Sequence, residues 1–126
     1  MLGVGVWGLV NFLLHTVRAD ETAQHIGWPT GNPFQSEIAV TSLALGVLGL
    51  LCFFITSRGF WTATVISLSV FYLGASVVHI HEMVAHGNFH PGNAGFAFYL
   101  DIALPLVLIG LLIADRATAP QTESVR

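Results

Sequence analysis

The sequence contains no lysine, and its basic side chains are four arginines among 126 residues. Charged residues make up 9% of the chain, whereas a soluble domain carries about 25%. A nucleic-acid-binding protein presents clustered basic side chains, so this shortage excludes nucleic acid as a partner. The single cysteine, Cys52, lies within an apolar run, which excludes a disulfide framework and a cysteine metal cluster.

Hydrophobic side chains are abundant, at 54% of the residues. They form four runs: Leu2–Val17, Ile38–Thr56, Phe60–Ile80 and Gly95–Ala114. A helix of about 20 apolar residues crosses the bilayer core, and about 17 is the lower limit. The first run is short, but no basic segment precedes it, so we interpret it as a retained span rather than a signal peptide. The sequence predicts an all-α fold, a four-helix antiparallel transmembrane bundle over residues 1–114 with a polar tail over residues 115–126.

The connections between these runs differ in length. Residues 18–36 form a long connection in which proline and glycine residues break any helix. Residues 57–59 form a tight turn, and residues 82–94 form a third, turn-like connection. Arg58, Arg116 and Arg126 fall on one side of the predicted bundle, and Arg18 falls on the other. Because positive charge favours the cytoplasm, we expect a multi-pass protein of the bacterial inner membrane with both termini in the cytoplasm.

Histidines and carboxylates gather at the opposite, extracytoplasmic end of the predicted helices. His15 ends the first run, Glu37 opens the second, His79 ends the third, and Asp101 lies about two turns into the fourth. Ionisable groups are costly in hydrocarbon and usually mark a site facing the bundle interior. The candidate ligand-binding residues are His15, Glu37, Tyr72, His79, Glu82 and Asp101. We expect His81 to point away from this site, and His25 and His90 to be solvated loop residues.

Three uses of this site fit its residue types. His79, Glu82 and His86 share one helical face, and imidazole with carboxylate suits zinc, iron or copper. Acid–histidine pairs also relay protons or carry out acid–base chemistry on a lipid-soluble substrate such as a quinone. Alternatively, the groups hydrogen-bond one another and hold the helix ends together, at about 0.6–2 kcal/mol for each bond. The sequence contains no nucleophile–base pair, phosphate loop or dinucleotide fingerprint that would decide whether the protein is an enzyme.

Small residues line one face of the second run: Ala39, Ser42, Gly46 and Gly49. Such residues let a neighbouring helix approach closely. The neighbour is either another helix of the same chain, or a second copy or larger membrane complex docked on this face.

The stretch HIGWPTGNPFQSEIAVTSLALGVLGLL, from His25 to Leu51, combines a Gly-x-Pro loop with an acid that opens a glycine-containing helix. This stretch resembles the DoxX-like group of small bacterial membrane proteins, and in particular a branch of undefined function. The resemblance implies a compact four-helix bundle over residues 1–114 and extends to the Gly27–Pro29 loop, Glu37 and Gly46. It also implies a redox-linked or accessory role.

Two functions follow as hypotheses. The first is a redox-accessory membrane protein that binds a lipid, a quinone or a metal ion at its histidine–carboxylate site. The second is a structural subunit of a larger membrane complex, with no ligand of its own and with its polar groups serving as internal links between helices.

Overall fold

The computed structural model describes residues 1–118, and within that range the regular structure is helical, with no strand. The predicted all-α class is therefore confirmed. The helices in chain order are α1 (Leu2–Val17), α2 (Ala19–Ile26), α3 (Phe34–Phe54), α4 (Arg58–His86), α5 (Pro91–Ala94) and α6 (Phe96–Thr118).

Among residues 1–118, three segments are long and apolar enough to cross a membrane: α3, α4, and Pro91–Thr118, which joins α5 and α6. These segments correspond to the second, third and fourth apolar runs. The first run forms α1 with the predicted bounds. However, α1 meets the same criterion only together with α2, and a bend of 103° separates the two helices.

The first connection contains a helix that the sequence reasoning missed. Residues 19–26 form α2, and only the part after it is irregular. Asp20 and Glu21 lie in its first turn and His25 lies in its last. The helix dipole favours acidic side chains at the N-terminus and basic side chains at the C-terminus. Gly27 ends α2 with a φ of +86°, a left-handed conformation that glycine adopts without strain. The third connection likewise contains the short helix α5.

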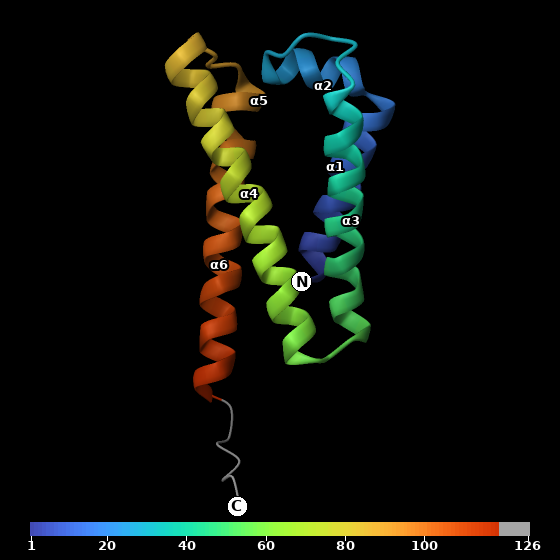
Figure 1. The fold of residues 1–126 in the computed structure, drawn as a ribbon, viewed down its shortest axis with the longest axis vertical. Helices are drawn as coiled ribbons and strands as arrows, with labels where there is room; N and C mark the ends of the chain where they lie inside the picture. Colours follow the sequence, from blue (N-terminus) through green and yellow to red (C-terminus); the bar gives the residue numbers. More distant parts are fainter. Residues whose placement is uncertain (119–126) are drawn as a thin grey trace, which may run out of the picture.

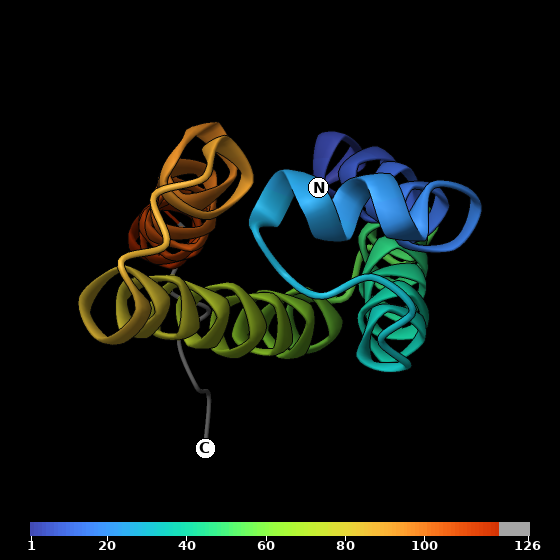
Figure 2. The same ribbon diagram turned by 90° about the horizontal axis from the view of Figure 1, so that it is seen from above.

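The long helices pack as two pairs, α1 with α3 and α4 with α6 (Figure 1). The pairs lie closest where α3 connects to α4, and they diverge towards the other end of the molecule. At that end α2 crosses from α1 towards α5 (Figure 2). The long helices alternate in direction along the chain.

Glycine residues bring α1 and α3 into backbone contact. A Cβ atom added to Gly8 would lie 2.5 Å from Cα of Gly46, and one added to Gly49 would lie 2.8 Å from the backbone nitrogen of Gly5. Ala39 and Ser42 of the same α3 face are also buried within the chain. The small-residue face of α3 is therefore used inside this chain, against α1.

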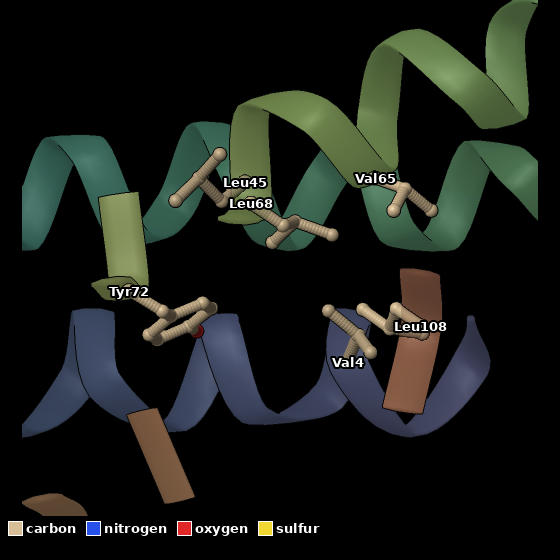
Figure 3. Packing of buried hydrophobic residues seen from close by; sticks show 6 residues of the cluster. All are labelled: Val4, Leu45, Val65, Leu68, Tyr72 and Leu108. Carbon is tan, nitrogen blue, oxygen red and sulfur yellow. The ribbon is translucent and has the colours of Figure 1, made fainter. Parts of the chain in front are cut away.

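A hydrophobic cluster joins all four long helices (Figure 3). It consists of Val4, Leu45, Val65, Leu68, Tyr72 and Leu108. Tyr72 lies at one edge of this cluster. It also lines the space between the diverging helix ends, so it marks the boundary between the packed core and that space.

The end of the molecule near the α3–α4 connection is held by polar contacts between α4 and α6. Nε of Arg58 lies 3.1 Å from a carboxylate oxygen of Asp115, and Arg116 donates to the Thr62 hydroxyl at 3.0 Å. Helix α6 continues through Thr118 and so includes the first residues of the predicted tail. The rest of that tail, with Arg126, lies outside the described residues.

Candidate functional site

A cavity of about 290 Å³ lies between the diverging helix pairs, and residues of all six helices line it. Most of its lining is apolar or aromatic, with Trp7, Trp28, Phe71 and Phe96 among the contributors. The polar residues of the lining are Asn11, His15, Thr22, His25, Ser42, Tyr72, His79 and Asp101. An apolar pocket with a few convergent polar groups is the usual form of a small-molecule site.

His79 is the most firmly held of these polar groups. The residue is buried, at 8% exposure, and its Nδ1 lies 2.6 Å from Oδ1 of Asn93, which is fully buried. Nδ2 of Asn93 donates to the carbonyl oxygens of His79, at 3.2 Å, and Asn88, at 2.8 Å. Because both amide hydrogens of Asn93 are used, its oxygen must accept the proton of His79 Nδ1. The other ring nitrogen, Nε2, is thereby left free for a second partner.

Nε2 of His79 faces Asp101, with 3.6 Å between the nitrogen and a carboxylate oxygen. Both side chains line the cavity, and Asp101 is only 9% exposed. With Nδ1 carrying one proton, a neutral His79 and an ionised Asp101 would present two acceptors to each other. The pair is satisfied when it holds an additional proton, or when a bound molecule donates a hydrogen bond to it.

His15 approaches the cavity from α1 and is paired with a residue of α3. Its Nδ1 lies 2.5 Å from Oε1 of Gln35, and both side chains are buried. Nε2 of Gln35 has no hydrogen-bond partner among residues 1–118. A buried donor of this kind costs about 1–3 kcal/mol when it is left unpaired.

Four of the six predicted ligand-binding residues therefore share one cavity: His15, Tyr72, His79 and Asp101. The other two, Glu37 and Glu82, do not line it. Glu37 is exposed, because α3 turns Gln35 inward and places the residue two positions later on the other face. The polar group that α3 presents to α1 is therefore the Gln35 amide. The sequence predicted the Glu37 carboxylate in this role.

The predicted metal ligands are divided between two places. Glu82 and His86 lie together, at 3.0 Å between Oε1 and Nδ1, but the third member of their group is His81. His79 is absent from that group and lines the cavity instead. His81 is exposed and does not line the cavity, and its Nδ1 lies 4.0 Å from the same carboxylate oxygen of Glu82.

Three further residues of the site were not expected. His25 is exposed, as the sequence predicted, but it belongs to α2 rather than to a loop, and it lines the cavity. Asn88 is buried and donates to the carbonyl oxygen of Ile26 at 3.0 Å, which ties the end of α2 to the α4–α5 connection. Asn93 holds His79. The signal that could have found the two asparagines is their place beside glycine and proline in HGNFHPGN, where amides often satisfy turn backbones.

The fold and this site define an all-helical protein with helices of membrane-spanning length and a partly polar interior cavity. The chain belongs to a family of unknown function, DUF6790, whose model matches residues 1–121. This membership agrees with the expectation of a branch of undefined function. No curated protein and no solved structure matches the chain.

Proposed function

We propose that this protein crosses the bacterial inner membrane four times, as an antiparallel bundle with both termini in the cytoplasm. α1 is the fourth pass: at about 1.5 Å per residue its 16 residues span about 24 Å, somewhat less than the bilayer core of about 30 Å. The 103° bend then lays α2 along the outer surface, above the cavity. The end that carries Arg58 and Arg116 is the cytoplasmic end.

The function that we propose is the binding of a lipid-soluble molecule with a quinone-type head group in this cavity. The observation that carries the proposal is the His79–Asp101 pair, buried beside an aromatic lining and oriented by Asn93. With an additional proton, the pair donates a hydrogen bond to a quinone carbonyl. Without that proton, it accepts one from a quinol hydroxyl.

The size and lining of the cavity support this class of ligand. Drug-sized pockets range from about 300 to 1,000 Å³, so a cavity of about 290 Å³ suits a single ring system better than a bulky head group. Trp7 and Phe96 approach edge to face, with 6.5 Å between ring centroids, and both contribute to the lining. Flat aromatic surfaces of this kind favour a planar ligand. The isoprenoid tail of such a ligand would extend into the lipid.

Tryptophan fluorescence provides the test, because Trp7 and Trp28 line the cavity whereas Trp61 lies at the α3–α4 connection. Ubiquinone-1 is titrated into the full chain in lipid nanodiscs. We expect saturable quenching in the wild type, and only the unsaturable quenching of lipid partitioning in the W7F/W28F double variant. If the fluorescence quenching of the wild type does not saturate, that result would contradict quinone binding.

Substitutions in the polar pair separate specific binding from simple partitioning. A hydrogen bond to a charged group contributes about 1.5–3 kcal/mol, so Asp101→Asn and His79→Gln should each weaken binding by about tenfold or more. Glu37→Gln is the matched control, because this carboxylate is exposed and does not line the cavity. If the two cavity variants bind ubiquinone-1 as tightly as the control, the polar groups act as links between helices, as the structural-subunit hypothesis states.

A further inference from the structure

A second group of metal-ligand side chains lies outside the cavity, on the last two turns of α4. It consists of His81, Glu82 and His86, which each offer a ligand atom within 4.8 Å of the others. Oε1 of Glu82 lies 3.0 Å from Nδ1 of His86 and 4.0 Å from Nδ1 of His81. None of the three lines the cavity. We refer to them as the α4 triad.

We propose that the α4 triad binds a divalent transition-metal ion, with zinc as the ion best suited to it. Two imidazoles and one carboxylate form a ligand set that zinc accepts, and three protein ligands leave a fourth position open to water or another molecule. Zinc–nitrogen and zinc–oxygen bonds are about 2.0–2.2 Å long. The ligand atoms must therefore move closer together, which the exposed imidazoles of His81 and His86 achieve by rotation.

The electrostatic setting of the α4 triad favours a cation. Helix α4 ends at His86, so the partial negative charge of its C-terminus lies beside the triad. The arginine of α4, Arg58, begins the same helix and is therefore at its far end. Glu82 supplies a formal negative charge at the centre of the group.

The length of α4 brings the triad within reach of water. Its 29 residues extend about 43 Å at 1.5 Å per residue, whereas the bilayer core is about 30 Å thick. If the helix crosses the membrane, its last turns project beyond the hydrocarbon. His81 and His86 are exposed at this end, with 67% and 58% of their side chains accessible.

The test is calorimetric titration of Zn²⁺ alone into the full chain in nanodiscs, after removal of metal by a chelator. We expect one ion per chain. Loss of even an outer-shell partner weakens metal binding by about 10–100-fold, so Glu82→Gln and the double variant H81A/H86A should weaken it at least as much. His90→Ala is the matched control, because His90 is another exposed histidine near this end that is not in the triad.

Two results would overturn the proposal. One is wild-type binding no tighter than that of the H81A/H86A variant. The other is loss of binding in His79→Ala with full binding in H81A/H86A, which would move the metal into the cavity. Far-ultraviolet circular dichroism of each variant checks that the exposed substitutions leave the helices intact. Ubiquinone-1 binding by H81A/H86A should equal that of the wild type. A failure of the metal-site proposal can therefore be distinguished from a failure of the quinone-binding proposal.

Discussion

One amide, that of Asn93, holds both the ring and the backbone of His79. Its Oδ1 accepts from the ring at 2.6 Å, and its Nδ2 donates to the carbonyl oxygen of the same histidine at 3.2 Å. The short helix α5 therefore determines the direction in which a side chain of α4 presents its free nitrogen. This dependence leads to the first prediction.

Replacing Asn93 with leucine should destabilise the protein and weaken ligand binding together. The substitution leaves the His79 ring and two carbonyl groups without their partner, at a cost of about 1–3 kcal/mol for each buried group that remains unpaired. We expect a lower midpoint of thermal unfolding and weaker quenching by ubiquinone-1. Gln24→Leu, at an exposed position of α2, is the control and should leave both values unchanged. Equal behaviour of the two variants would show that Asn93 does not orient the site.

Gly27 and Gly31 form a natural comparison, because both have positive φ, of 86° and 68°. A Cβ atom at position 27 would lie 2.6 Å from Oδ1 of Asn88, whereas one at position 31 would meet nothing within 4 Å. Gly31→Ala should therefore cost about 1–2 kcal/mol of backbone strain. Gly27→Ala should cost more and should also raise hydrogen exchange in residues 19–26, since it displaces Asn88 from Ile26. Equal exchange in the two variants would contradict the role of this contact in holding α2.

The contact between α1 and α3 predicts opposite signs for two glycine-to-alanine changes. Gly8→Ala places a methyl group against the Gly46 backbone, and overpacking of this kind costs about 1–3 kcal/mol. Gly110 lies on α6, and a Cβ atom added there would meet nothing within 4 Å. Gly110→Ala removes a mid-helix glycine and should therefore stabilise the protein by about 0.5–1 kcal/mol. Unfolding in a graded detergent mixture measures both. A stabilising Gly8→Ala would show that the two helices are further apart than described.

The proposed topology can be tested with single cysteines in a Cys52→Ala background. Ser57→Cys at the α3–α4 connection should react with a membrane-impermeant maleimide only after the cytoplasmic face is opened. Thr30→Cys, in the connection after α2, should react in intact spheroplasts. The reverse labelling pattern would show that the protein has the opposite orientation in the membrane. Reaction of both cysteines from one side would mean that α3, the helix between the two positions, does not cross.

The sequence predicted the long helices well, because continuous apolar runs leave helices as the form that satisfies the backbone in lipid. It missed α2 and α5, since elements of 8 and 4 residues are too short for a periodic pattern to establish. It placed the close-packing glycines on the correct face of α3, because their spacing follows the helical repeat. It did not indicate that the two helix pairs diverge, which depends on how side chains fill the space between them.

Within the site, the sequence indicated the buried ionisable groups but not their supports. His79 and Asp101 were prominent because charge within an apolar run is costly. Gln35, Asn88 and Asn93 give no such signal in the sequence, because amides in loops and at helix starts are common on protein surfaces. Glu37 was expected to face the interior on the basis of its charge, although its position relative to Gln35 places it on the outer face.

Because the two helix pairs diverge, the proposed ligand site is largely separate from the hydrophobic cluster that packs the long helices together. Five of the six residues of the hydrophobic cluster lie outside the cavity lining, whereas residues of all six helices surround the cavity. Tyr72 is the member of the cluster that also lines the cavity. Under the proposed function, substitutions at cavity-lining positions outside the cluster should change which molecules bind, with little effect on the packing of the cluster itself.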